Sequence, residues 1–181
     1  MRIVVIYESM FGNTRRIAES IVEVLGATAE VRLVRAGLHT EVATSDVDLF
    51  VVGAPTHAWS MPRANTRRGA LEDVRKSGGE LVLEENADSL PGVREWFESL
   101  ATVHALGAAF DTRLNAPAAL TGRASKVIAT SLARHGLDVV LPAESFLVDR
   151  HNQLLDGELD RARTWATTLA AEATHHLSVG H

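Results

Sequence analysis

Four residues near the amino terminus, Ser9, Gly12, Asn13 and Thr14, have the side chains and the spacing of an anion-binding turn. They follow an apolar run at residues 3–6 and come directly before a segment with the apolar periodicity of a helix. The first N–H groups of a helix have no partner within it and carry partial positive charge, so a phosphate binds well there. The hydroxyls of Ser9 and Thr14 can also donate to phosphate oxygens. We therefore predict a phosphate site at this turn.

The same turn argues against two common nucleotide sites. No lysine lies between Ser9 and Thr14, and the GxxxxGK[ST] pattern of ATPase phosphate loops is absent. The spacing also fails the GxGxxG pattern of dinucleotide-binding turns. A phosphate held by neutral donors alone favours a mononucleotide cofactor. The alternative is a plain strand–turn–helix corner that binds no ligand.

The pattern Ser9-x-x-Gly12-x-Thr14 after the first strand resembles the phosphate loop of flavodoxins and flavodoxin-like domains, which usually reads [ST]-x-[ST]-G-x-[ST] and holds the phosphate of FMN. The chain departs from this pattern at Phe11, where a hydroxyl residue is usual. A bulky residue at that position is familiar from the flavodoxin-like domains of larger flavoproteins. The resemblance implies that the whole loop binds FMN, namely Ser9, Met10, Phe11, Gly12, Asn13 and Thr14.

A second loop, at residues 53–63, resembles the second flavin loop of the family, which often carries an aromatic residue. Trp59 in this loop can stack on the isoalloxazine ring of FMN, or it can pack against its own loop. The resemblance assigns five residues of this loop to the cofactor: Pro55, Thr56, His57, Ala58 and Trp59.

The third loop is expected at residues 110–115, after the fourth strand, where the family's backbone amides usually bind the pyrimidine edge of the flavin. The resemblance assigns Phe110, Asp111, Thr112 and Arg113 to this loop. Asp111 and Thr112 can instead cap the turn, which is a structural role. A cation at Arg113 beside the ring would stabilise reduced, anionic flavin.

The expected rim of the site is rich in basic side chains, whereas small carrier flavodoxins usually surround the flavin with carboxylates. The rim comprises His57, Arg63, Arg67, Arg68 and Arg113 against Asp111, and the direction of Glu8 is left open. This balance favours an anionic or electron-accepting small molecule, or an acidic protein partner. Arg67 and Arg68 can alternatively be the solvated face of a helix.

The elements that position these loops alternate along the chain. Apolar periodicity and turn residues predict strands at 2–8, 29–35, 47–53, 103–110 and 137–149, the last broken by Pro142. They predict helices at 13–25, 66–76, 91–101, 119–135 and 157–174. This order predicts an α/β fold, a doubly wound five-stranded parallel sheet in the order 2-1-3-4-5 with helices on both faces, as one flavodoxin-like domain over residues 1–181. The first and second loops then meet where the strand order reverses.

Composition narrows the functional classes. The chain has 181 residues, a net charge of −5 and no cysteine, which argues against nucleic-acid binding, disulfides and thiolate chemistry and leads us to expect a cytoplasmic protein. No apolar run approaches the ~20 residues of a membrane-spanning helix. The histidines lack an HExxH pattern, so we expect no metal site.

The sequence therefore indicates an FMN-binding redox protein that carries electrons between protein partners or to a small acceptor such as a quinone. If it is an enzyme, it is an FMN-dependent oxidoreductase of the quinone-reductase type. No catalytic residue is assigned. The alternative is a non-redox flavodoxin-fold interaction or regulatory module without flavin. A phospho-receiver ranks last, because Tyr7-Glu8-Ser9 lacks the acidic pair that such a domain needs after its first strand.

Overall fold

A single parallel sheet organises the computed structural model, which describes residues 1–38, 44–57, 60–79 and 81–179. Its strands are β1 (Arg2–Tyr7), β2 (Glu30–Arg35), β3 (Leu49–Pro55), β4 (Leu106–Leu114), β5 (Asp138–Val139) and β6 (Glu144–Val148). The order is β2-β1-β3-β4, and both β5 and β6 pair with the outer edge of β4. The predicted order 2-1-3-4-5 is confirmed, with the fifth strand divided into two short segments on either side of Pro142.

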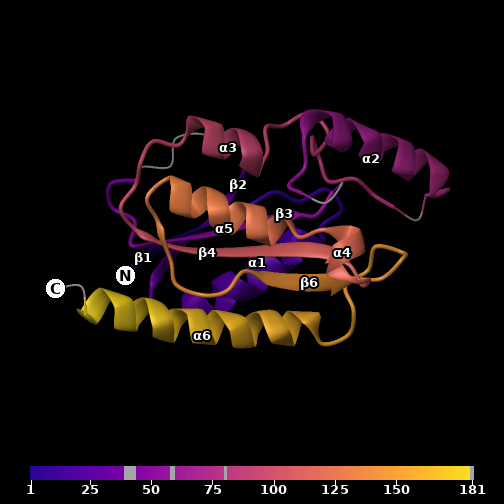
Figure 1. Cartoon of the computed structure of the whole chain (residues 1–181). Coiled ribbons are helices and arrows are strands. Elements are labelled where there is room, and N and C mark those ends of the chain that lie inside the picture. Colours follow the sequence, from indigo (N-terminus) through magenta and orange to yellow (C-terminus); the bar gives the residue numbers. More distant parts are fainter. Residues whose placement is uncertain (39–43, 58–59, 80, 180–181) are drawn as a thin grey trace.

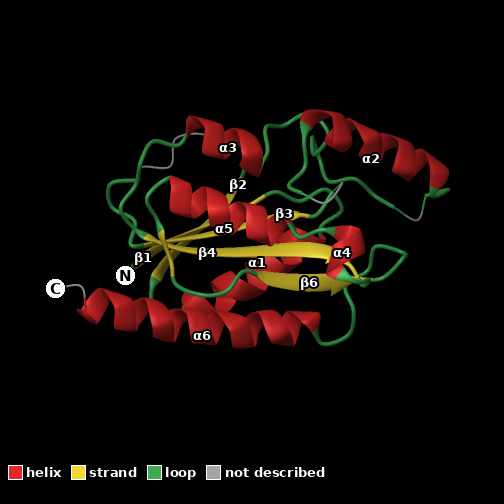
Figure 2. Ribbon diagram, viewed as in Figure 1, coloured by secondary structure: helices red, strands yellow, loops and turns green. Residues whose placement is uncertain are grey.

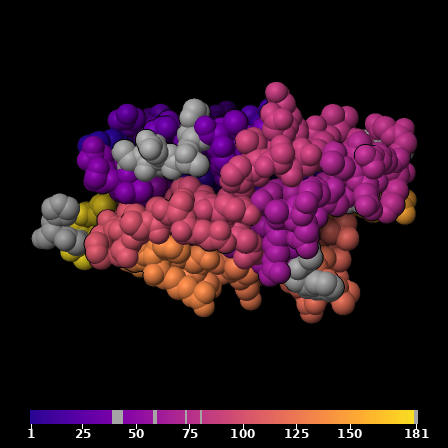
Figure 3. Space-filling model, turned by 90° about the horizontal axis from the view of Figure 1, so that it is seen from above, coloured from indigo at the N-terminus to yellow at the C-terminus, as the bar shows by residue number. Residues whose placement is uncertain are grey.

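Helices cover both faces of the sheet (Figures 1 and 2). They are α1 (Asn13–Leu25), α2 (Ala64–Lys76), α3 (Val93–Ser99), α4 (Ala118–Thr121), α5 (Ala124–Arg134) and α6 (Glu158–Val179). Helices α1 and α6 pack against one face, and α3 and α5 pack against the other. Viewed from above, the segment that contains α2 and α3 forms a band across the molecule (Figure 3).

The central strands are buried on both sides, which explains their continuous apolar sequences. In β1, Ile3 and Val5 belong to the core beneath α1 and α6, whereas Val4 and Ile6 belong to the core beneath α3 and α5. Strand β3 divides in the same way. Because both cores draw on the same two strands, the carboxyl ends of β1 and β3 are fixed side by side.

Strand β4 is longer than the sequence predicts. The expected loop at residues 110–115 is wrong as far as Leu114, because residues 110–114 pair in register with residues 144–148 of β6. The polar composition of this stretch suggested a loop. The parallel partner, which lies more than thirty residues further along the chain, makes it a strand instead.

The predicted helix at 119–135 is two helices, α4 and α5. Gly122 lies between them with a φ of 74°, a left-handed conformation that favours glycine and cannot continue a right-handed helix. The break matters for the site, because it places the amino terminus of α5 against the end of β3.

In the described part of the chain, none of the helices is long and apolar enough to cross a membrane. The same residues contain no group of three or more histidine, aspartate or glutamate side chains that could hold a metal ion.

Candidate functional site

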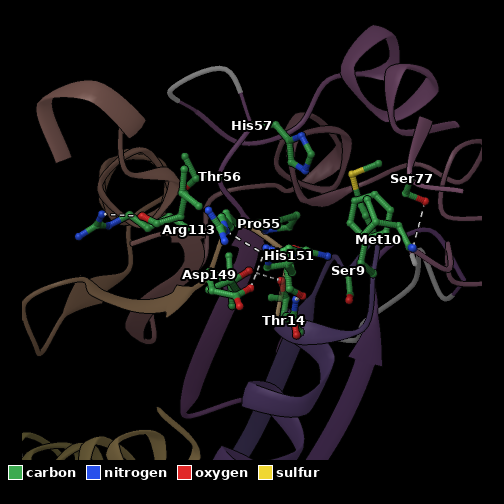
Figure 4. Close-up of a pocket in the computed structure, with 18 of the residues that line it drawn as sticks. Ser9, Met10, Thr14, Pro55, Thr56, His57, Ser77, Arg113, Asp149 and His151 are labelled. Carbon is green, nitrogen blue, oxygen red and sulfur yellow. Dashed lines mark hydrogen bonds between the residues drawn. The ribbon is translucent and has the colours of Figure 1, made fainter. Parts of the chain in front are cut away.

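A cavity of about 520 Å³ lies at the carboxyl ends of the central strands (Figure 4). This volume is within the range of small-molecule and cofactor sites. Ten of the predicted site residues line it: Ser9, Met10, Phe11, Asn13, Thr14, Pro55, Thr56, His57, Thr112 and Arg113. Gly12, Phe110 and Asp111 do not line it, and Ala58 and Trp59 lie outside the described residues. The structure thus brings the three predicted loops together around one space.

The turn before α1 has the geometry of an anion site. Gly12 precedes the helix with a φ of 88°, and no side chain caps the first turn. The Gly12 amide donates to Ser9 Oγ at 3.1 Å, which closes the turn. The amides of Asn13 and Thr14 have no acceptor within the helix, so they can donate to a ligand. These residues fit the phosphate of FMN, which needs several convergent donors.

The role of Gly12 is conformational. A β-carbon built at Gly12 would approach no atom closer than 3.9 Å, and its nearest neighbours are the side chains of Arg15 and Glu84. Glycine is needed here because the left-handed backbone disfavours other residues, and the need does not come from crowding. The expected phosphate contact at position 12 therefore involves the backbone.

Hydroxyl groups join the loops across the floor of the cavity. Thr14 Oγ1 and Thr112 Oγ1 lie 2.7 Å apart and share a hydrogen bond between α1 and β4. The Thr56 amide donates to the Thr112 carbonyl at 2.8 Å, and Thr56 Oγ1 accepts from the Ala124 amide at 2.9 Å. Thr56 therefore caps α5 while it lines the cavity, and hydrogen bonds connect the three loops to one another.

The side chains of two residues assigned to the third loop are buried away from the cavity. Phe110 is buried, with its ring 6.2 Å from Phe146 and 6.3 Å from Trp165. Asp111 is buried on the opposite face, where Oδ2 accepts from the Ser125 amide at 2.7 Å and caps α5. Burial raises the pKa of the Asp111 carboxyl, although that hydrogen bond lowers it. Because strand residues alternate between faces, neither of these side chains lines the cavity, and a contact of their backbone amides with the flavin stays a prediction.

The side chain of Arg113 lines the cavity and also bonds within its own segment. Its Nη1 donates to the carbonyl of Ala116 at 2.7 Å, to that of Leu114 at 3.2 Å and to Thr121 Oγ1 at 3.3 Å. Figure 4 shows the guanidinium turned away from Ser9 and Thr14. Arg113 thus orders the segment from β4 to α4 through Nη1, while its buried Nε has no hydrogen-bond partner among the residues that the structure describes.

The second loop is held in place from α3. His57 and Ser60 exchange two backbone hydrogen bonds, of 2.9 and 3.0 Å. Arg94 Nη2 donates to the Met61 carbonyl at 3.1 Å and to Ser60 Oγ at 3.3 Å. The predicted stacking of Trp59 falls on a residue outside the described part of the chain and stays a prediction.

Behind the phosphate loop, a buried ion cluster replaces part of the expected basic rim. Arg67 is 4% exposed, and its guanidinium contacts Glu95 Oε1 at 2.8 Å and Glu8 Oε1 at 3.4 Å. Glu8 Oε2 also accepts from the Val93 amide at 3.0 Å, and Glu95 Oε2 accepts from the Gly92 amide at 2.8 Å. Arg67 therefore lies neither on the rim nor on a solvated helix face, whereas Arg63 and Arg68 are exposed.

The two carboxyls of this cluster differ because they share one cation. Burial raises the pKa of Glu8, against the lowering effect of the Val93 amide and the Arg67 guanidinium. Burial would also raise the pKa of Glu95, but hydrogen bonds from Arg67 and the Gly92 amide lower it overall. The Glu8 side chain is also more deeply buried, 7% exposed against 30% for Glu95, and its contact with Arg67 is longer, so burial outweighs the cation at Glu8 alone.

Sequence reasoning missed two segments that complete the cavity. One follows α2 and contributes Lys76, Ser77 and Leu81, and the other follows β6 and comprises residues 148–152. The second was open to prediction, because a loop after the fifth parallel strand must lie at the same edge of the sheet as the phosphate loop. The first was not, because residues 80–90 show no periodicity.

Comparisons with known proteins agree with this geometry. A family model described as a flavodoxin domain matches residues 4–73. Among solved structures, the chain is similar to a flavodoxin from the domain Archaea, at 19% identity with a TM-score of 0.62, covering 97% of this chain and 100% of the other. It is similar to oxidised flavodoxin 1 from Bacillus cereus, at 19% identity with a TM-score of 0.63, covering 97% and 99%.

A third likeness is to part of a larger protein, the rubredoxin oxygen:oxidoreductase from Desulfovibrio gigas, at 18% identity with a TM-score of 0.59, covering 97% of this chain and 37% of the other. No curated protein sequence matches this chain. The structural likenesses show the fold, and the family model covers the first phosphate loop and the second loop. The resemblance expected from Ser9, Gly12 and Thr14 is confirmed.

Proposed function

We propose that this chain, which matches a flavodoxin domain model over residues 4–73 and has the fold of solved flavodoxins, binds one FMN in the cavity described above and carries electrons. The observation that carries the proposal is the turn before α1. An uncapped helix start, a left-handed Gly12 and the hydroxyl of Thr14 all line or border one cavity of cofactor size. Bound FMN supplies the redox chemistry, and the protein supplies position and electrostatics.

Each loop has a distinct part in this proposal. The amides and hydroxyls of the phosphate loop hold the phosphate, and the second loop, fixed by Arg94, forms one wall for the flavin ring. The end of β4 forms the floor through Thr112. Trp59 remains our candidate for stacking on the ring.

The electrons pass to a protein partner or to a small acceptor such as a quinone. The open cavity supports direct access of an acceptor, and the exposed Arg63 and Arg68 lie at the end of the second loop and on the helix that follows it. Since Arg67 and Arg113 are engaged inside the protein, the basic character of the rim rests on fewer residues than the sequence indicates.

The function is tested with protein saturated with FMN and freed of excess cofactor by gel filtration. After anaerobic reduction, it is mixed with a soluble quinone and, separately, with an oxidised redox protein such as cytochrome c. Recovery of the oxidised flavin spectrum faster than with the same concentration of free FMN is expected for at least one acceptor. Failure of the protein to retain FMN would contradict the proposal and favour a module without flavin.

A further inference from the structure

The loop after β6 is fastened directly to the phosphate loop. Asn13 Nδ2 donates to the Asn152 carbonyl at 2.7 Å, across 139 residues of sequence. Residues 149–152 and the phosphate loop line the same cavity, and Figure 4 shows Asp149 and His151 beside Thr14. A group that enters the predicted phosphate position is therefore also close to the loop at residues 149–152.

The shape of this loop is fixed by its own hydrogen bonds. Asp149 Oδ1 accepts from the amides of His151 at 2.9 Å and Gln153 at 2.8 Å. The Asp149 amide donates to the Gln153 carbonyl at 2.8 Å, and Asn152 has a φ of 58°. The amide of Gln153, together with that of His151, lowers the pKa of Asp149. The carboxylate is thus held by main-chain amides of the loop, and the nearby charge of Arg150 also lowers its pKa.

Arg150 is presented on the cavity wall by this loop. Its Nε donates to His151 Nε2 at 3.1 Å, so the imidazole orients the guanidinium. The remaining N–H groups of the guanidinium form a fork that matches two oxygens of a phosphate. The imidazole nitrogen is the acceptor here, which makes His151 a positioning residue for Arg150.

Three other cationic side chains near the cavity contact acceptors within the protein. Arg15 Nε lies 2.7 Å from Glu84 Oε1, and the guanidinium of Arg113 is held by main-chain carbonyls. Lys76 lies across the cavity, where Nζ is 3.8 Å from Glu72. Arg16 lines a neighbouring hollow with Asn13 and Asn152, whereas Arg150 lines the predicted cofactor cavity itself.

We propose that Arg150, positioned by His151, contacts the phosphate of FMN and makes this site selective for FMN over riboflavin. The inference rests on the proposed function. It adds a cationic contact, from the far end of the chain, to a phosphate site whose own loop contains neutral donors. The hydrogen bond from Asn13 to Asn152 joins the loop that carries Arg150 to the phosphate loop.

The test is a titration of apo protein with FMN and with riboflavin, followed by quenching of flavin fluorescence. Arg150→Gln is expected to weaken FMN binding about tenfold, as for loss of a charge-assisted hydrogen bond, and to leave riboflavin binding unchanged. Arg150→Lys should recover part of the loss. The FMN affinity of the wild type should fall with added salt more steeply than that of Arg150→Gln.

The matched control is Arg32→Gln, the same change at an exposed arginine in the middle of β2, and it should bind both ligands as the wild type does. His151→Ala should weaken FMN binding in the wild type but have no further effect in Arg150→Gln, because it acts through Arg150. An additional loss in the double variant would overturn that positioning role.

The outcomes separate the inference from the proposed function. If the wild type binds FMN and Arg150→Gln keeps the wild-type ratio of FMN to riboflavin affinity, the inference is overturned and the cofactor stands. The same holds if Arg150→Gln weakens both ligands equally, because the loop is then only structural. If wild-type protein binds neither flavin, the proposed function fails and the inference fails with it.

Discussion

The two ends of the segment from Glu8 to Thr14 lie in opposite environments. At its start, Glu8 is buried and shares the guanidinium of Arg67 with Glu95. At its end, Asn13 and Thr14 present neutral hydrogen-bonding groups to an open cavity. The comparison teaches that the buried end satisfies full charges with partners inside the protein, whereas the phosphate loop itself presents neutral donors to the cavity.

The physical basis is the cost of taking charge out of water. A buried ion stabilises a fold only when its partners and hydrogen bonds are complete, and removing one partner leaves an uncompensated charge. Neutral amides at a helix start carry a smaller desolvation cost, and they attract an anion through the helix dipole. The buried end should therefore govern stability, and the open end should govern ligand affinity.

The largest effect is expected at the buried end. Arg67→Met leaves the Glu8 and Glu95 carboxylates without their cation, and it should lower the free energy of unfolding by about 3–5 kcal/mol. Arg68→Met, at the next position of α2, removes an exposed guanidinium and should change stability by about 0.5 kcal/mol or less. Urea denaturation at neutral pH measures both. Equal, small effects would mean that water reaches the cluster and that the comparison fails.

The turn between the two ends gives the next effect. Gly12→Ala forces a side chain onto a left-handed backbone and should cost about 1–2 kcal/mol of stability, with weaker FMN binding. Gly69→Ala is the control, since a β-carbon at this helical position meets nothing within 4 Å and should stabilise α2 by about 0.5–1 kcal/mol. Opposite signs in thermal denaturation are the expected result. A stabilising Gly12→Ala would show that the turn does not need its left-handed residue.

Much of this site follows from the sequence, and the rest depends on contacts that no local pattern encodes. The strand, turn and helix around Gly12 are predictable, because apolar periodicity and turn chemistry are local. Arg67 was misassigned because its partners lie 59 and 28 residues away in sequence, and an isolated arginine on a polar helix gives no sign of burial.

The third loop shows the same limit of prediction from local sequence. Polar residues at 111–113 have the composition of a loop, but β6 extends β4 through them and directs Asp111 and Arg113 to other elements. The loop at 149–152 joins the site through the pairing of β6 with β4 and through the hydrogen bond from Asn13 to Asn152. Local sequence therefore predicts the turn that we propose as the phosphate site and misses the part of the cavity that long-range pairing positions.

At the open end, the expected change is smaller in stability and larger in binding. Thr14→Val removes the hydroxyl that is 2.7 Å from Thr112 Oγ1, and it should cost about 1 kcal/mol of stability and weaken FMN binding about tenfold. Thr14→Ser keeps the hydroxyl and should restore most of the affinity. Calorimetric titration with FMN measures the change. If Thr14→Val binds FMN as tightly as the wild type, the phosphate lies elsewhere.

The smallest effect is a pair of opposite pH dependences at the buried end. Because the folded-state pKa of Glu8 is raised, its contribution is full below its unfolded pKa of about 4.3 and is lost as pH rises through the folded value. The folded-state pKa of Glu95 is lowered, so its contribution is present above about 4.3 and is lost as pH falls.

Glu8→Gln and Glu95→Gln remove these two titrations separately. Relative to Glu8→Gln, the wild type should lose unfolding free energy as pH rises from about 4 to neutrality, whereas relative to Glu95→Gln it should gain. Denaturant unfolding across this pH range gives both slopes. Slopes of the same sign would mean that the two carboxyls share Arg67 equally.

The central claim, that the turn before α1 binds the phosphate of FMN, is tested most directly by comparing the affinities of the wild-type apo protein for FMN and riboflavin under identical conditions. The two ligands differ only in the phosphate. FMN is expected to bind at micromolar concentration or below, and riboflavin at least about tenfold more weakly, the loss expected when charge-assisted contacts to a phosphate are absent. Equal affinities would contradict the account.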